Sequence, residues 1–510
     1  MLLLALLACA DAPPPPAGEV IFVRDGIILP GGGGLRDQAW SPGQRVEVEG
    51  AAGTAPAQAE CVTLWQAELG DVARLVAMQG VPDTALAFSP GAGERLAIGT
   101  VHGEVFVFDG WTGQQQARRR LPEALVRALA WSPDGATLYV SEQSPDAALR
   151  ALDPATLEER WSLRLADVVG TSAPPAGEDL YGVYSLPAGF GLAVLPAGDL
   201  LVAATHGWGD ASGQRRNQGQ LLRVSPDGAI AARWPVDPAE VTLLHPVVDL
   251  DGQRVAVAVG HSSSRPPPPE LPVGGVQVLS LPDLAPVASA RAAPLAPWFT
   301  EAWVWEALDL SAADDTLFMG LNDGRVQLWD LTGSLRAERA GGAPVMAGQV
   351  PVHVGVGWGL LHQAQAFYVT SSTRIPWGAA APDLRPPSTH PDQNSLFAVG
   401  LDGQRVWSWS GAHELQGLSL SPDGDELVIG AGARVADQRR DLYGALVFHA
   451  RPPAGPDGSP GAALRAFCAT EGPVFFRHAV TADGRVAVAE HPFADADGVQ
   501  HGAYRVSVLR

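Results

Sequence analysis

The stretch Thr84–Gln114 reads TALAFSPGAGERLAIGTVHGEVFVFDGWTGQ, a series of apolar segments separated by short polar turns. Within the segments, Val, Ile, Leu and Phe recur at every second position, which is the period of a half-buried β-strand. The turn Ser89-Pro90-Gly91 carries the residues that favour tight reversal of the chain. This stretch therefore predicts antiparallel strands joined by hairpins.

The same pattern recurs along the chain. Clear copies begin at Val126, Ala307 and Leu415, and weaker ones have inner strands near Leu192, Val247, Gly355 and Val480. The eight copies begin near residues 84, 126, 190, 245, 306, 354, 415 and 475. A period of roughly 40–45 residues with four short strands per copy is typical of the blades of a β-propeller. We therefore expect an all-β fold of about eight blades. Seven remain an alternative, because the copies near 190 and 354 are irregular.

The repeats resemble those of bacterial WD40-like and YVTN-like propellers. Trp329-Asp330 stands where such repeats place a Trp-Asp pair, whereas their Gly-His dipeptide is missing. The resemblance implies the fold and no particular activity.

The two chain ends are expected to close the ring. The last copy supplies strands only around His478, Val486 and Val506, so one outer strand is missing. The apolar segment Val72–Met78 is predicted to supply it, which would leave no unpaired edge at the seam. On this interpretation residues 72–510 form the propeller and residues 19–71 form a small β cap, with two or three strands at Val20–Val23, Arg45–Glu49 and Cys61–Gln66.

The N-terminus predicts export. Residues 1–9 resemble a bacterial lipoprotein signal, in which Leu6-Leu7-Ala8 precedes a lipidated Cys9. The apolar run is too short to cross a bilayer as a helix. Residues 10–18 contain Pro13 to Pro16 and read as a stiff tether. The chain is thus expected to be exported and anchored by lipid in the bacterial envelope, at the outer membrane on its periplasmic or surface side. The lipid anchor is its only expected contact with the membrane.

Two further cysteines, Cys61 and Cys468, are left over. An exported compartment permits disulfides, and an even remainder fits one bridge. Cys468 falls on the expected outer strand of the seventh blade, near the ring seam. A bridge between the two cysteines and a pair of buried free thiols both remain open at this point.

The charge excludes one class of partner. The formal net charge is −21, and the 34 basic residues are all Arg. Nucleic-acid binding needs a basic footprint that neutralises phosphates, so a nucleic-acid partner is not expected. Neither composition nor motifs indicate a cofactor, and the sequence leaves the oligomeric state undetermined.

Loop lengths distinguish the two faces of the ring. Turns after the first and third strands of a blade are tight, as in Ser132-Pro133-Asp134-Gly135. Long insertions gather on the face formed by the other connections, which usually marks the binding face of a repeat fold. They are Ala166–Ala188, Thr205–Gly219, Gly260–Gly274, Arg291–Trp305, Ser371–Asn394, Gly430–Gly444 and Glu490–Gly502, and His449–Gly461 is the exception.

The insertions concentrate Trp, Tyr, Arg and His, which include the types enriched at interaction hot spots. The candidate binding residues are His206, Trp208, Arg215, Arg216, His261, Arg265, Trp303, Arg374, Trp377, His390, Arg439, Arg440, Asp441, Tyr443 and His491. They favour a non-enzymatic binding or scaffold protein that holds an envelope protein or a glycan.

An enzyme is the alternative hypothesis. No nucleophile elbow, phosphate loop or zinc-protease motif is present, so no catalytic residue is assigned. A propeller-type hydrolase or metal-dependent oxidoreductase would place its site at the mouth of the central channel. Its metal candidates are His206, His261, His491, Asp495 and Asp497. Convergence of His206, His261, Glu490 and His491 on one ion would favour this alternative.

The lipid anchor can be tested directly. Replacing Cys9 by Ala removes the thiol that would carry the lipid, so the protein should move from the membrane fraction to the soluble exported fraction. Fractionation followed by immunoblotting measures this change. Retention of Cys9→Ala in the membrane would contradict lipidation at this residue.

Overall fold

The structure is a computed structural model that describes most of the chain. The residues it describes are 21–23, 26–28, 61–70, 84–122, 124–172, 186–249, 251–261, 263–294, 302–342, 345–347, 350–370, 390, 392–432, 442–453, 463–494 and 499–510. Strands dominate these residues, and the helix α4 (Ala166–Val169) is a single short turn. Among the described residues, no helix has the length and apolar character needed to cross a membrane.

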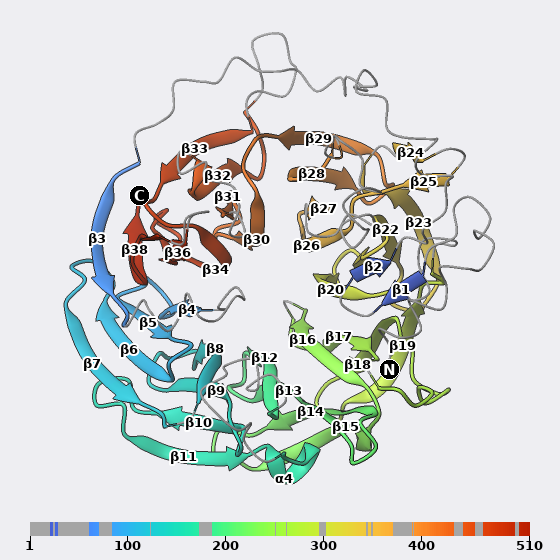
Figure 1. The fold of residues 1–510 in the computed structure, drawn as a ribbon, viewed down its shortest axis with the longest axis horizontal. Coiled ribbons are helices and arrows are strands. Elements are labelled where there is room, and N and C mark those ends of the chain that lie inside the picture. The colour runs from blue at the N-terminus through green and yellow to red at the C-terminus, as the bar shows by residue number, and fades with distance from the viewer. Residues whose placement is uncertain are drawn as a thin grey trace.

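The strand pairings sort the ring into eight antiparallel groups of four, arranged around a central opening (Figure 1). Each group runs from an inner strand beside the opening to an outer strand at the rim. The first blade consists of β4 (Ala85–Phe88), β5 (Arg95–Gly99), β6 (Glu104–Asp109) and β7 (Gln115–Arg120), and the second of β8 (Leu125–Trp131), β9 (Leu138–Gln143), β10 (Ala148–Leu152) and β11 (Glu159–Arg164). The third blade consists of β12 (Ala188–Val194), β13 (Leu200–Gly209), β14 (Arg215–Val224) and β15 (Ile230–Ala239), and the fourth of β16 (Thr242–Val248), β17 (Arg254–Gly260), β18 (Gly275–Ser280) and β19 (Ala285–Arg291).

The remaining four blades follow the same order. The fifth blade consists of β20 (Val304–Ser311), β21 (Thr316–Leu321), β22 (Arg325–Trp329) and β23 (Leu335–Ala340), and the sixth of β26 (Val356–His362), β27 (Gln365–Thr370), β28 (Ser395–Gly400) and β29 (Arg405–Ser410). The seventh blade consists of β30 (Leu415–Leu420), β31 (Glu426–Ala431), β32 (Gly444–His449) and β33 (Leu464–Ala469), and the eighth of β34 (Val474–Val480), β35 (Val486–Glu490), β38 (Arg505–Leu509) and β3 (Thr63–Glu68). The predicted all-β propeller, with an N-terminal strand at the outside of the last blade, is confirmed.

The Ser-Pro-Asp-Gly turns behave as their chemistry predicts. In the second blade, Asp134 Oδ1 accepts the N–H of Ala136 at 3.0 Å, and Ser132 Oγ accepts the N–H of Thr137 at 2.9 Å. Gly135 has φ of 67°, a conformation that glycine adopts without the steric cost of a Cβ atom. These local bonds reverse the chain between first and second strands without any insertion.

Neighbouring blades pack through their apolar faces and touch through a few backbone contacts. The inner strands β20 and β26 pair in parallel at Glu306↔Trp358 and Ala307↔Gly359. Asp309 Oδ2 accepts the N–H of Leu361 at 2.7 Å across the same junction. These contacts join the fifth and sixth blades into one continuous sheet, although each keeps its own four-stranded meander.

The strand that closes the ring is β3, and this corrects the prediction that Val72–Met78 would do so. β3 pairs antiparallel with β38, with Gln66 opposite Ser507 and Glu68 opposite Arg505. Residues 72–78 lie outside the described residues. The segment expected as the last strand of a separate cap therefore belongs to the propeller.

Side chains at the seam explain the choice of strand. Trp65 points inward from β3, packs against Phe108 of the first blade, and donates Nε1–H to Gly110 O at 3.3 Å. A Cβ atom on Gly113 would lie only 2.5 Å from the Trp65 ring, so the indole fills the space that glycine leaves. One side chain thus fixes the outer strand of the last blade against the first blade.

A buried arginine joins the same two blades beside Trp65, because both side chains donate to Gly110 O. Arg485 is fully buried, and its Nη1 donates to Gly110 O at 2.8 Å and to Gly93 O at 3.2 Å. Asp483 lies 3.1 Å from Arg485 Nε and balances its charge. Trp111 covers the guanidinium at 3.6 Å from the ring centroid. A buried cation with all these partners locks the first and last blades together.

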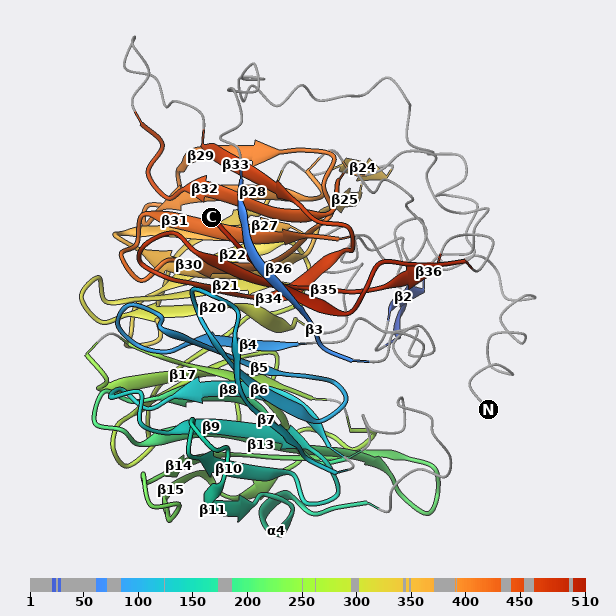
Figure 2. The ribbon, with the colours of Figure 1, turned by 90° about the vertical axis from the view of Figure 1, so that its left-hand side faces the viewer.

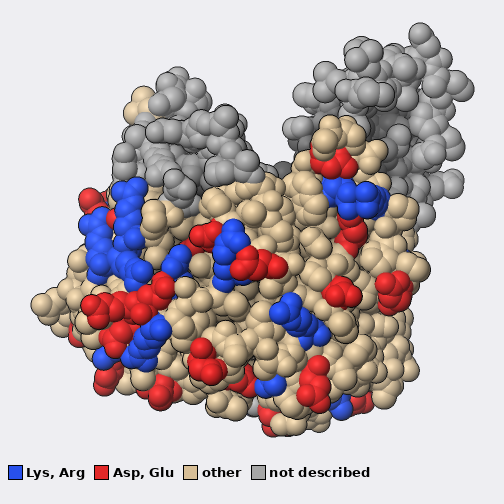
Figure 3. All heavy atoms as spheres, turned by 90° about the horizontal axis from the view of Figure 1, so that it is seen from below, with Lys and Arg blue, Asp and Glu red and all other residues tan. Residues whose placement is uncertain are grey.

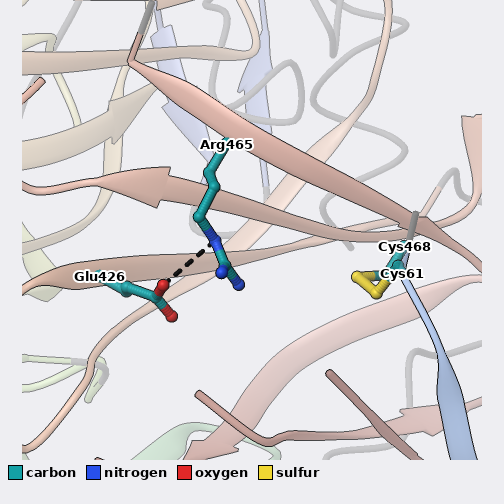
Figure 4. Close-up of a disulfide and its surroundings, with 4 residues drawn as sticks. All are labelled: Cys61, Glu426, Arg465 and Cys468. Carbon is teal, nitrogen blue, oxygen red and sulfur yellow. Dashed lines mark ion pairs between the residues drawn. A yellow bond between two sulfur atoms is a disulfide. The ribbon is translucent and has the colours of Figure 1, made fainter. Parts of the chain in front are cut away.

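A disulfide fastens the start of the closing strand to the seventh blade. Cys61 and Cys468 are bonded, with their Cα atoms 5.2 Å apart, within the roughly 7 Å limit for a bridge. Cys468 lies on β33, the outer strand of that blade, as the sequence indicated. Figure 4 shows the bridge near the ion pair of Arg465 with Glu426, whose Nε–Oε1 distance is 3.1 Å.

Three small hairpins lie outside the ring pattern. They are β1 (Ile21–Val23) with β2 (Gly26–Ile28), β24 (Val345–Ala347) with β25 (Val350–Val352), and β36 (Phe493–Ala494) with β37 (Gln500–His501). Figure 2 shows β2, β24, β25 and β36 on the same side of the ring. β1 coincides with a strand expected in the N-terminal cap, whereas residues 45–49 lie outside the described residues.

Breaking the disulfide should weaken the whole ring. Cys468→Ser removes a crosslink between residues 407 positions apart, and chain-entropy models assign such a long loop about 4–5 kcal/mol at most. We expect the urea midpoint of the exported, oxidised protein to fall. Cys61→Ser should have the same effect, and the double variant no further effect. Three variants as stable as the native protein would contradict a stabilising bridge.

Candidate functional site

The described connections support the sorting of insertions onto one face. β36 and β37 lie between the second and third strands of the last blade, and β24 and β25 lie between the fifth and sixth blades. Both kinds of connection emerge on the same face of a four-stranded blade. We call this the insertion face; it is the right-hand side of Figure 2.

The longest described arm of this face is the hairpin of β13 and β14. Each strand has ten residues, and the pairing continues to Trp208↔Arg216 and Gly209↔Arg215. The turn is held by Asp210, whose Oδ1 accepts the N–H of Ser212 at 2.9 Å and that of Gln214 at 3.0 Å. The arm is thus ordered to its tip.

Three predicted residues meet on one side of this arm. His206 and Trp208 are two positions apart on β13 and stack, with ring centroids 4.6 Å apart. Arg216, the cross-strand neighbour of Trp208, places its guanidinium carbon 5.7 Å from the indole centroid. The strand period of two and the antiparallel register produce this arrangement without help from other blades.

A carboxylate links the third blade to the fourth at the base of the arm. Glu240 accepts a hydrogen bond from Arg216 Nε at 2.8 Å, and Arg265 Nη1 lies 3.8 Å from the same oxygen. Partial burial pushes the pKa of Glu240 upward, but the hydrogen bonds from Arg216 and Ser263 outweigh it and hold that pKa below its usual value. Glu240 therefore stays ionised between the two arginines.

The loop after β17 docks on the arm through backbone and hydroxyl groups. Ser264 donates its N–H to Arg215 O at 2.7 Å, and Arg215 donates its N–H to Ser264 Oγ at 3.1 Å. Ser263 Oγ donates to Arg215 O at 3.2 Å. Arg215 and Arg265 are both exposed beside these bonds. We call Trp208, Arg215, Arg216, Glu240 and Arg265 the rim platform; His206, which is 3% exposed, is buried and supports it by stacking on Trp208.

Other predicted residues are buried. The exposed fractions of His261, His390, Tyr443 and His491 are 9%, 1%, 3% and 2%. Tyr443 packs edge-on against Phe493, with ring centroids 5.4 Å apart. These side chains stabilise the bases of the insertions and do not present a surface.

Trp303 also has a packing role. A Cβ atom on Gly260 would lie 2.3 Å from its ring, so the indole rests directly on the end of β17. The other candidates, Arg374, Trp377, Arg439, Arg440 and Asp441, lie outside the described residues, as do Asp495 and Asp497.

The histidines proposed as metal ligands do not converge. Among the described residues, no group of three or more His, Cys, Asp or Glu side chains is arranged to hold a metal ion. His206 lies in the third blade against Trp208, whereas His491 packs between Phe475 and Tyr504 at the seam. The arrangement expected for the metal-dependent alternative is therefore not formed by His206, His261 and His491.

The carboxylate of Glu490 stabilises the last blade through hydrogen bonds. It is 1% exposed, and Arg505 donates to both oxygens, from Nε at 3.0 Å and from Nη2 at 2.9 Å. The N–H groups of Glu471 and Gly472 also donate to Oε2, at 3.1 and 3.3 Å. With its oxygens saturated in this way, Glu490 has no room for a ligand.

The sequence analysis missed a second cluster, which lies around the central opening. The inner strands shift register part-way along, in every described blade except the first, at Val126/Ala128, Gly189/Leu192, Leu244/Val247, Val304/Leu308, Val356/Trp358, Gln416/Ser419 and Val474/His478. Such bulges re-aim side chains and are frequent beside functional sites.

Charged side chains from three blades meet at these bulges. Arg477 of β34 donates from Nη2 to Glu306 Oε1 of β20 at 3.1 Å, and His245 Nε2 of β16 lies 3.3 Å from the same oxygen. The eighth blade faces the fourth and fifth across an eight-membered ring, so this contact spans the opening (Figure 1). The signal that could have indicated it is the placing of charged residues within otherwise apolar inner strands.

The surface elsewhere mixes charges of both signs. On the side of the ring at the bottom of Figure 1, acidic and basic side chains lie interspersed (Figure 3). Many form pairs, such as Arg160 with Asp153 at 2.8 Å.

Comparison with solved structures gives the fold at low identity. The quinohemoprotein alcohol dehydrogenase of Comamonas testosteroni matches with a TM-score of 0.56 and 14% identity, over 88% of this chain and 76% of that one. The C-terminal WD40 domain of Sif2 matches with a TM-score of 0.52 and 11% identity, over 88% and 97%. BamB from Moraxella catarrhalis matches with 13% identity over 89% and 98%, at a TM-score of 0.48 that is too low to carry an argument.

No family model matches the chain, and no curated protein matches it in sequence. At identities of 11–14% the likeness to solved structures establishes architecture alone. The chain is a β-propeller.

Buried histidines should make the ring sensitive to acid. Burial lowers the pKa of His478 and of His491 to about 3, whereas an unfolded histidine has a pKa of about 6.5. Between these values the unfolded chain binds more protons, so the free energy of unfolding should fall as pH falls from about 6.5 toward 3. His491→Gln should show a shallower fall, measured by urea unfolding at several pH values. A slope as steep as that of the native protein would contradict this assignment.

Proposed function

We propose that this protein is a non-enzymatic binding or scaffold protein of the bacterial envelope, which holds a partner protein or a glycan on its insertion face. The observation that carries this proposal is the rim platform. There the predicted residues Trp208 and Arg216 come together against the buried His206, beside the exposed Arg215 and Arg265, on the face that also receives the hairpins β24–β25 and β36–β37.

The platform has the properties of an interaction surface. Two blades build it, and the hydrogen bonds between Arg215 and Ser264 fix their loops relative to each other. A partner therefore meets arginines that are already positioned, which lowers the entropic cost of association. Trp and Arg are the residues that most often dominate binding energy at such surfaces.

The enzyme alternative receives less support from the geometry. Its expected group of His206, His261, Glu490 and His491 is divided between separate blades, and Glu490 is saturated by Arg505 and backbone N–H groups. Among the described residues, that group forms no cluster that could hold a metal ion. The binding role requires no such convergence.

Envelope attachment is part of the same proposal. Cys9 would carry the lipid, and residues 10–18 would hold the propeller away from the bilayer. The disulfide between Cys61 and Cys468 supports export, because such bonds persist mainly in oxidising compartments. The propeller at one end of the tether would then bind the partner, and the lipid at the other end would anchor the protein.

Site-specific photo-crosslinking tests which face binds. A photoreactive phenylalanine at Ser212, at the exposed tip of the β13–β14 arm, should crosslink to an envelope component in intact cells. The same residue at Pro133, exposed in a tight turn of the opposite face, serves as the matched control and should not. Mass spectrometry of the adduct identifies the partner as protein or glycan.

The outcome can also contradict the proposal. Equal crosslinking from Ser212 and Pro133, or crosslinking from Pro133 alone, would mean that the insertion face is not the binding face. Correct folding of both variants is checked by their urea midpoints, which should match that of the native protein since neither residue is buried.

A further inference from the structure

The cluster around the central opening consists of two basic groups and one acidic group. Arg477 Nη2 and His245 Nε2 both approach Glu306 Oε1, at 3.1 and 3.3 Å, and lie 3.5 Å from each other. The side chains keep 30%, 23% and 12% of their surface exposed, in the order Arg477, His245, Glu306. Solvent therefore reaches all three groups.

The backbone is strained where these side chains leave it. His245 has φ of 32°, and Phe476, next to Arg477, has φ of 46°. Non-glycine residues rarely adopt this conformation, and those that do are found mainly at functional sites. Both residues lie within the register shifts of β16 and β34. The strained backbone therefore directs the side chains of Arg477 and His245 toward the same atom, Glu306 Oε1.

The ring is closed by contacts that do not involve Arg477 or His245. The seam is already closed by β3, by Arg485 and by the disulfide. The surrounding inner strands carry mainly apolar side chains, such as Leu244 and Val247 on β16. A charged cluster in such surroundings interacts more strongly with an ion than an exposed pair would.

We propose that Arg477 and His245 form a carboxylate-binding site at the centre of the ring, where solvent reaches both side chains and Glu306 acts as an internal competitor. The carboxylate of Glu306 occupies the position that a ligand carboxylate would take, between the guanidinium and the imidazole. Arginine suits this chemistry because its N–H groups match the geometry of a carboxylate. Binding exchanges one carboxylate for another and moves no electrons.

This site goes beyond the proposed binding of a protein or glycan on the rim platform. Its residues come from β16, β20 and β34, and none of them belongs to the platform. The ligand carboxylate could come from a small diffusible acid or from the end of a polypeptide. Both sources share the same chemistry, and the experiment distinguishes them.

The test uses variants with opposite expected effects. Succinate is titrated into the purified full-length protein and followed by calorimetry. Glu306→Gln removes the competing charge, so succinate should bind about tenfold more tightly or more, the worth of one charge-assisted bond. Arg477→Gln should weaken binding by about the same factor. A gain of affinity in Glu306→Gln cannot arise from loss of folding.

Arg336→Gln is the matched control. Arg336 also pairs with a carboxylate, that of Asp315, but on the outer strand β23. Succinate affinity should be unchanged in this variant. A peptide with a free C-terminal carboxylate, compared with its amidated form, reports on the polypeptide source. Tighter binding of the free-acid peptide than of succinate would identify that source, and the reverse would identify a small acid.

Two outcomes would overturn the proposal. Equal affinity of Glu306→Gln and the native protein for both succinate and the free-acid peptide would show that Glu306 competes with no ligand. Unchanged affinity in Arg477→Gln would show that the guanidinium does not bind the carboxylate. Photo-crosslinking from Ser212 requires neither residue, so these results leave the role of the insertion face untouched.

Discussion

The pairing of β3 with β38 is the interaction on which the rest of this structure depends. A propeller blade packs the faces of its sheet against its two neighbours, so an incomplete last blade would leave both an unpaired strand edge and an uncovered apolar face. β3 covers that edge, and Trp65 reaches from it to the first blade. The disulfide of Cys61 with Cys468 ties the same strand to the seventh blade. The outer strand of the last blade thus connects three consecutive blades.

Closure also fixes the distance across the ring. Arg477 and Glu306 come from the eighth and fifth blades and approach to 3.1 Å only because every intervening blade is present and packed. The rim platform, in contrast, depends on one hairpin and on a loop of the next blade. The two candidate sites therefore differ in how much of the fold each needs, although both lie on connections or strands that the closed ring supports.

Arginine–carboxylate pairs occur at different degrees of burial in this structure. We assign a structural role to the fully buried pair and a binding role to the pair that solvent reaches. Glu490 is 1% exposed and receives both nitrogens of Arg505 together with two backbone N–H groups. Removing either partner would leave an uncompensated buried charge, which is strongly destabilising. Glu306 keeps access to solvent, and its partners come from strained backbone. The first pair holds a blade together, whereas the second can exchange partners with a ligand.

The sequence by itself determined the repeat and most of its details. The predicted copies coincide with inner strands that begin at residues 85, 125, 188, 242, 304, 356, 415 and 474, because alternation and Ser-Pro-Asp-Gly turns are local properties. The grouping of His206, Trp208 and Arg216 was also within reach, since all three lie on one hairpin. Local pattern could not choose between residues 63–68 and 72–78 as the closing strand, because both have strand-like sequences. The fit of Trp65 against Gly113 decided that choice. Only the tertiary structure brought His245, Glu306 and Arg477 together. Arg477 is 171 positions from Glu306 and 232 positions from His245, so these side chains meet only when the ring is closed.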